Sequence, residues 1–227
     1  MAAEVVPLFP LNHVLLPGMP LPLHVFEPRY RDLLADITGP SGDKAFGVVA
    51  LRRGSEVRTP RVARHGLPDV EEVGTLAEII ENEPRGDGSS DVLTIGSRRF
   101  RIASLLPDGT AYLRGMIEYL DEPEGELSPD TVAGARRLLE HYDAILLRVA
   151  GRTTGTDLPT DPTLLSYQIA ARLPLPPGER QVLLRAATTA QRLDRLTRLL
   201  HREIGLLQGT RSIAVSPAVL RLATSAN

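Results

Sequence analysis

The chain has 227 residues, a formal net charge of −2 and no cysteine. The missing cysteines exclude disulfides, thiolate metal sites and cysteine nucleophiles, and the small charge gives no overall attraction to nucleic acid or anionic membranes. No apolar run approaches the roughly 18–20 residues that span a bilayer, and the first residues lack the pattern of a signal peptide. We therefore expect a soluble, cytoplasmic protein.

The first half of the sequence reads mainly as β-strands joined by turns. One helix is expected at about Pro28–Ile37, because proline suits a first helical position and Glu27 places negative charge at the helix N-terminus. Asp108-Gly109 is a hairpin signal, since glycine accepts a positive φ. Apolar or alternating segments predict strands at Val5–Phe9, Leu21–Phe26, Ala45–Leu51, Val73–Glu83, Val92–Ile95, Phe100–Leu105 and Ala111–Leu120.

The second half of the sequence has helical periodicity. An acidic Pro/Gly stretch, Asp121–Ser128, precedes it, and Ser128 is a cap for a first helix. Asp161-Pro162 opens a second helix, a short third helix follows Pro177, and Thr188 with Gln191 forms a capping box for a fourth. The sequence thus predicts an α+β chain: a β-rich domain at residues 1–122, a helical domain at 123–209 and a loosely held tail at 210–227.

Five short motifs occur in an order that is more specific than any one of them. They are PLFPL (Pro7–Leu11), LPLHVFEPRY (Leu21–Tyr30), FGVV (Phe46–Val49), VGTLAEI (Val73–Ile79) and GSRRFRI (Gly96–Ile102). In this order the sequence resembles the N-terminal substrate-binding domain of Lon proteases. The resemblance implies a PUA-like pseudobarrel followed by a helical bundle, and a partner that is an unfolded or otherwise exposed polypeptide.

Catalytic and metal sites find little support in the sequence. Lys44, the single lysine, lies between Asp43 and Ala45, so the chain has no G-x-x-x-x-G-K-[ST] phosphate loop. Beside a Gly/Ser/Asp turn, Lys44 is also a poor buried base for a serine–lysine peptidase of the Lon type. The five histidines form no H-x-x-x-H or H-E-x-x-H pair that would indicate zinc. We expect a stand-alone, non-enzymatic binding protein or adaptor that uses no cofactor and no metal.

The connection His13–Pro22 between the first two strands is the first candidate binding surface. It is apolar and stiffened by prolines, and exposed apolar side chains there would suit unfolded polypeptide. The alternative is that these side chains seal one end of the barrel. The candidate residues are Val14, Leu15, Leu16, Met19 and Leu21.

The strand-to-helix corner Phe26–Tyr30 is a second candidate. Arg29 and Tyr30 could offer a charge and a flat ring to a peptide. The structural interpretation, which we favour, is that Phe26 belongs to the core, Glu27 caps the helix and Arg29 pairs locally.

Two groups of arginines suggest further partners. Arg98, Arg99 and Arg101 surround Phe100, so binding of nucleic acid is an alternative function. The same alternation is also typical of a solvated strand face. Arg99 is in addition a candidate for contact with polypeptide. The second group follows one stripe of the fourth expected helix. It could meet acidic partners or an anionic lipid surface, but we favour the interpretation that it is the solvated side of an amphipathic helix. That stripe comprises Arg192, Arg195, Arg198 and Arg202.

Overall fold

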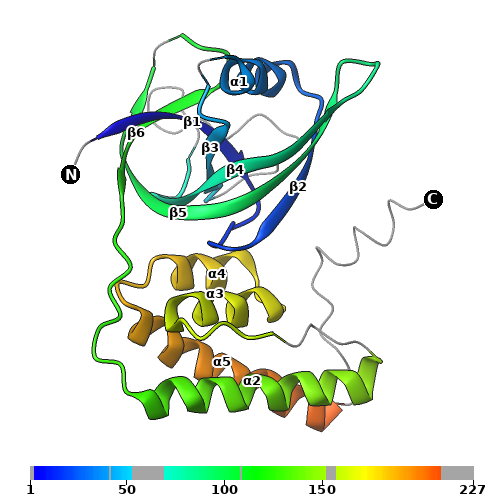
Figure 1. The fold of residues 1–227 in the computed structure, drawn as a ribbon, viewed down its shortest axis with the longest axis vertical. Helices are drawn as coiled ribbons and strands as arrows, with labels where there is room; N and C mark the ends of the chain where they lie inside the picture. The colour runs from blue at the N-terminus through cyan, green and yellow to red at the C-terminus, as the bar shows by residue number, and fades with distance from the viewer. Residues whose placement is uncertain (1–2, 41, 53–68, 108, 152–156, 211–227) are drawn as a thin grey trace. The chain divides into compact units, whose positions relative to one another are not determined.

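The computed structural model describes residues 3–40, 42–52, 69–107, 109–151 and 157–210. The chain divides into two compact units, Met1–Asp121 and Glu122–Asn227. The first unit holds the strands and one helix, and the second holds the remaining helices (Figure 1). Apart from its first residue, the tail predicted at 210–227 lies outside the described residues.

The described residues of the first unit form six strands and one helix, and most of these elements lie within two residues of their expected bounds. β5 differs, because two short strands were expected where the chain forms one continuous strand. The elements are β1 (Glu4–Leu11), β2 (Pro20–Val25), α1 (Pro28–Thr38), β3 (Ala45–Ala50), β4 (Val73–Pro84), β5 (Ser90–Leu106) and β6 (Leu113–Tyr119).

The strands form one sheet that closes on itself. Its order is β2-β5-β4-β3-β1-β6, and an additional pairing between β5 and β6 completes a barrel. β1 and β3 are parallel, and the other pairs are antiparallel. β4 pairs along one edge of β5. Along the other edge, the N-terminal half of β5 pairs with β2 and its C-terminal half pairs with β6. β2 is therefore an end strand that lies outside the closed barrel.

Another part of the backbone approaches β5 closely at Gly96. A Cβ atom at this position would lie 2.5 Å from the carbonyl oxygen of Leu16. The amide of Gly96 donates to the carbonyl of Met19, and its own carbonyl accepts from the amide of Gly18. Glycine at this position thus lets the connection before β2 lie directly on β5, rather than ending the strand.

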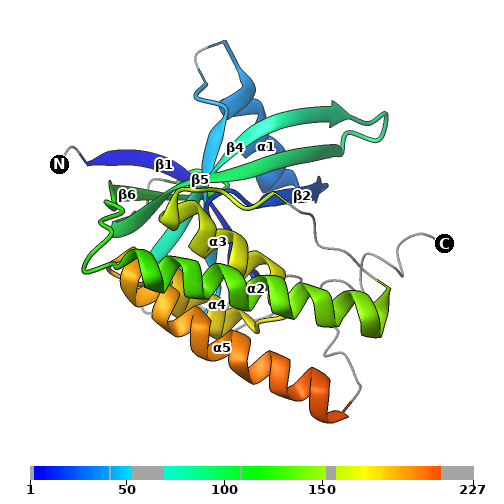
Figure 2. The ribbon, with the colours of Figure 1, turned by 60° about the horizontal axis from the view of Figure 1, so that its bottom comes forward.

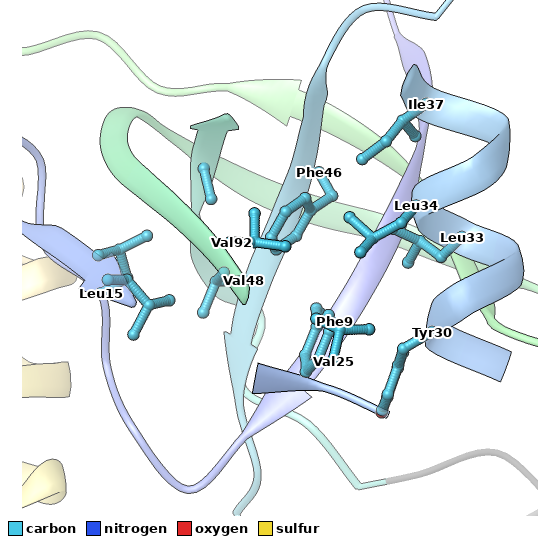
Figure 3. Packing of buried hydrophobic residues seen from close by; sticks show 12 residues of the cluster. Phe9, Leu15, Val25, Tyr30, Leu33, Leu34, Ile37, Phe46, Val48 and Val92 are labelled. Atoms are coloured by element: carbon cyan, nitrogen blue, oxygen red, sulfur yellow. The ribbon is translucent and has the colours of Figure 1, made fainter. Parts of the chain in front are cut away.

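Two clusters of buried side chains form the core of this unit. One joins α1 to β1, β2 and β3 (Figure 3), where the Phe9 and Tyr30 rings stack with centroids 3.9 Å apart. The buried face of α1 consists of Tyr30, Leu33, Leu34 and Ile37. The second cluster is centred on the fully buried Phe100 and includes Leu8, Val49 and Ile117.

In the part of the second unit that the structure describes there are four helices: α2 (Pro129–Ala150), α3 (Pro162–Arg172), α4 (Pro177–Leu184) and α5 (Thr189–Thr210). α2 and α5 lie side by side in Figures 1 and 2, and α3 also packs against α5. The expected caps are present, because Ser128, Asp161 and Thr188 each accept a backbone N–H three residues further on. No helix in the described ranges is long and apolar enough to cross a membrane.

The helical unit contains a fully buried arginine. Arg192 donates to the Glu122 carboxylate (2.9 Å), to Ser166 Oγ (3.0 Å) and to the Leu183 carbonyl (3.3 Å). Its guanidinium lies 4.0 Å from the centroid of the Tyr167 ring. The expectation that Arg192 belongs to a solvated stripe is therefore wrong, although Arg198 is exposed. The predicted α+β class with a β-rich N-terminal part is confirmed.

Candidate functional site

The His13–Pro22 connection does not present the apolar surface expected of it. Val14, Leu15 and Leu16 expose 2%, 1% and 0% of their surface. Thr75 Oγ1 donates to the Leu15 carbonyl over 2.7 Å, and Leu15 packs in the core cluster (Figure 3). The expectation that these three side chains are exposed is wrong, and their burial agrees with the alternative in which they seal the unit.

The other two apolar candidates of this connection also face inward. Leu21 is buried, and Met19 is partly buried against the same cluster. The alternation along β2 explains Leu21, because the side chains of Leu21 and Val25 are buried while those of Pro20, Pro22 and His24 are exposed. Whether any of these residues binds a partner stays a prediction, but an exposed apolar surface must be sought elsewhere.

An open groove of about 190 Å³ lies at the corner where β2 leads into α1. We call it the corner groove. Residues from the C-terminal ends of β1 and β2 and from the start of α1 line it. They are Phe9, Pro10, Leu11, Leu23, His24, Val25, Phe26, Glu27 and Tyr30.

Phe26 is the most exposed large apolar side chain among the described residues, at 61%. The β2 strand ends at Val25 and α1 begins at Pro28, so Phe26 lies in the short connection and not on the buried side of either element. Its ring lies 5.9 Å from the His24 ring, centroid to centroid. The prediction that Phe26 belongs to the core is therefore wrong, and the residue instead borders the groove.

Tyr30 and Arg29 occupy different parts of the same corner. The Tyr30 ring is buried, and burial raises the pKa of its hydroxyl to about 12. The Arg29 guanidinium lies 4.5 Å from the centroid of that ring and pairs with the Glu27 carboxylate at 2.8 Å. Local pairing of Arg29 was expected, whereas the Glu27 side chain makes no capping hydrogen bond to α1.

The charged groups beside the corner groove are largely compensated. His24 Nδ1 lies 2.7 Å from Asp91 Oδ1, and Asp91 also accepts from Arg85. The hydrogen bonds from His24 and Arg85 lower the pKa of the Asp91 carboxyl. With Glu27 paired to Arg29 as well, burial of apolar side chains is the main interaction that the groove offers a ligand.

Arg99, the remaining candidate, is 2% exposed and donates to the Asp121 carbonyl over 2.9 Å. The neighbouring Arg98 lies over the Tyr119 ring, 3.8 Å from its centroid. Arg99 thus contributes nothing to an accessible basic strip, although Arg101 is exposed. Nucleic-acid binding stays a prediction.

The sequence matches the profile of the ATP-dependent protease La (LON) substrate-binding domain over residues 5–202. The chain therefore belongs to the LON substrate-binding domain family. It is 28% identical over 204 residues to Lon protease 1 of Hydrogenovibrio crunogenus and 28% identical over 207 residues to Lon protease of Escherichia coli K12. The matches cover 88% and 89% of this chain, which spans about a quarter of those proteases, at 24% and 25% of their length.

Solved structures agree with this family. The fold is similar to the Lon N-terminal domain protein from Xanthomonas campestris, with a TM-score of 0.61, 26% identity, and coverage of 86% of this chain and 98% of that one. It also resembles the N-terminal domain of the Mycobacterium avium complex Lon protease, with a TM-score of 0.58, 20% identity and coverage of 87% and 98%. The relatives are matched through their N-terminal substrate-binding domain, as the sequence motifs indicated.

Proposed function

We propose that this chain is a non-catalytic protein that binds exposed segments of other polypeptides in the corner groove, either to hold them or to present them to a further protein. Membership of a substrate-binding domain family supports binding of polypeptide as the general role. Within these 227 residues the lone Lys44 lies between Asp43 and Ala45 and not in a G-K-[ST] phosphate loop, and its exposure does not suit the lysine base of a serine–lysine pair. Release of the bound segment then depends on modest affinity.

The observation that carries the proposal is the exposure of Phe26 beside the corner groove. A large apolar side chain in water costs free energy that a partner recovers by covering it, at roughly 25 cal/mol per Å² of apolar surface. The stacked Phe9 and Tyr30 rings give the groove a rigid wall, so few groups lose freedom when a segment binds. A groove of about 190 Å³ has room for one large apolar side chain of the partner.

Substitution of Phe26 tests this function. Phe26→Asp places a charge at the mouth of the groove, and we expect it to weaken binding of an unfolded client, such as a reduced and alkylated protein, by at least about tenfold. Binding is measured by fluorescence anisotropy of the labelled client. Ile80→Asp is the matched control, because Ile80 is 57% exposed and does not line the groove.

Both variants should keep the circular dichroism spectrum and unfolding midpoint of the parent protein, since both changes are at exposed positions. Equal binding by Phe26→Asp and the parent protein would remove the corner groove as the binding surface. A comparable loss in Ile80→Asp would show that general surface hydrophobicity, and not this groove, attracts the client.

A further inference from the structure

The outer edge of β2 has an unusual set of backbone groups. β2 pairs with β5 along one edge, and within the described residues no strand pairs with its other edge. Proline has no N–H, so Pro20 and Pro22 must occupy the positions whose backbone groups point away from β5. The Gly96 amide donates to the Met19 carbonyl, so the backbone groups of Met19 point toward β5. The backbone groups of the other odd-numbered residues of β2 then point toward β5 as well, and those of Pro20 and Pro22 point away from it.

The same alternation makes His24 the third residue whose backbone groups point away from β5. The outer edge therefore carries three carbonyl acceptors, those of Pro20, Pro22 and His24, but one N–H donor, that of His24. Its side chains at these three positions are exposed. An edge of this kind is complementary to a strand that offers N–H groups at alternate residues.

This edge borders the corner groove, because Leu23, His24 and Val25 belong to the lining of the groove. We propose that the client binds as an extended segment added to β2, with its N–H groups donated to the Pro20, Pro22 and His24 carbonyls. This inference rests on the proposed function and specifies its geometry. Strand addition of this kind uses main-chain hydrogen bonds for affinity and alternate side chains for specificity.

The register follows from strand geometry. A client residue opposite Leu23 has its side chain on the same face as Leu23, which lines the groove. With the client antiparallel to β2, the N–H of that anchor residue points away from β2. The residues immediately before and after it face His24 and Pro22 and donate to their carbonyls. The edge thus selects an extended segment with apolar residues at every second position and without proline beside the anchor residue.

Backbone N-methylation of a synthetic client tests the geometry directly, because it removes single N–H donors. The probe is a fluorescein-labelled, threonine-rich nonapeptide with phenylalanine at position 5 and valine at positions 3 and 7. Methylation at positions 4 and 6 should weaken its binding by about 30-fold or more, since two hydrogen bonds are lost. Methylation at positions 5 and 7 should leave the affinity within about threefold of the parent peptide.

A protein variant tests the single outward donor. His24→Pro removes this N–H at a position where an edge strand tolerates proline, and His24→Ala removes the side chain alone. We expect His24→Pro to bind the nonapeptide about three- to tenfold more weakly than His24→Ala. Equal affinities of the two variants would count against strand addition.

The outcomes separate this inference from the proposed function. If the parent nonapeptide binds and Phe26→Asp weakens it, but both methylated peptides bind equally, strand addition is wrong and the groove still binds polypeptide. If methylation at positions 5 and 7 is the more damaging change, the assigned register or the antiparallel orientation is wrong. If neither the nonapeptide nor an unfolded protein binds, the proposed function itself fails.

Discussion

Leu16 is a candidate binding contact in the sequence, but the structure places it in the core. Its side chain is fully buried, so a substitution there tests packing and not recognition. The apolar pattern of Val14–Leu16 fits a sealed barrel end as well as an exposed binding surface. The sequence could not separate these two, because both use apolar residues between prolines.

Leu16→Ala should lower the free energy of unfolding by about 2–5 kcal/mol, the usual cost of the lost burial and the resulting cavity. Urea denaturation followed by circular dichroism measures the change. Ile80→Ala is the control, since Ile80 is exposed and should change the free energy of unfolding by no more than about 0.5 kcal/mol. A Leu16→Ala protein of unchanged stability would mean that this side chain is not packed as the structure has it.

Phe26 is the residue that sequence reasoning placed wrongly. Apolar residues at 21, 23, 25 and 26 all invite assignment to the core, but the strict period of a strand accommodates the first three on one face. Extending that alternation by one step puts Phe26 outside, and Pro28 fixes the start of α1 two residues later. The sequence therefore contained this information, but Phe26 was assigned to the core because phenylalanine is usually buried.

At the scale of elements, strands and helices were largely predictable because local rules agreed with the tertiary structure. Prolines at helix starts and cap residues at Ser128, Asp161 and Thr188 fixed the helical unit. β5 was divided wrongly, since glycine in a strand usually signals a break or a turn. The reason for Gly96 is the contact with the Leu16 carbonyl, which no local pattern reports.

Gly74 on β4 illustrates the same dependence on a distant partner. A Cβ atom there would lie 2.5 Å from the Val48 carbonyl oxygen and 2.6 Å from Phe100 Cζ. Gly74→Ala should therefore destabilise the barrel by about 1–3 kcal/mol through overpacking. Thermal unfolding compared with that of Gly86→Ala is the measurement, because a Cβ at Gly86 meets open space.

Gly86→Ala should unfold within a few degrees of the parent protein. A Gly74→Ala protein with the same midpoint would show that the ring of Phe100 moves aside without cost. A low midpoint for both variants would point instead to a general intolerance of alanine at glycine positions in β4 and the turn that follows it.

At the scale of the whole molecule, the chain between the two units is fixed to the helices from Glu122 onward. The amides of Thr189 and Ala190 donate to the carbonyls of Pro123 and Glu124, and Arg192 holds the Glu122 carboxylate. The sequence predicts an acidic linker at 121–128, yet the carbonyls of Pro123 and Glu124 in this stretch cap the N-terminus of α5. Acidic side chains are compatible with a solvated linker and also with the N-terminus of a helix, so the sequence did not distinguish these two roles.

Arg192→Ala should destabilise the helical unit by about 3 kcal/mol, because Glu122, Ser166 and the Leu183 carbonyl lose their donor. Urea unfolding followed at 222 nm reports on the helices. Arg198→Ala on the same helix is the control, since its ion pair with Asp194 is exposed and should contribute less than about 0.5 kcal/mol. Similar losses in both variants would contradict the special role of the buried guanidinium.

The prolines of β2 also bear on how a protein with an open sheet edge avoids joining its own copies. If two such edges met antiparallel with Pro22 opposite its own copy, each Pro22 carbonyl would face a proline nitrogen that carries no hydrogen, and this pair would form no hydrogen bond. The lost hydration of these two carbonyls would disfavour that pairing, whereas a chain with N–H groups at those positions would satisfy them. The prolines of Pro-Leu-Pro-Leu-His would thus disfavour pairing of this edge with its own copy while leaving its carbonyls able to accept from another chain.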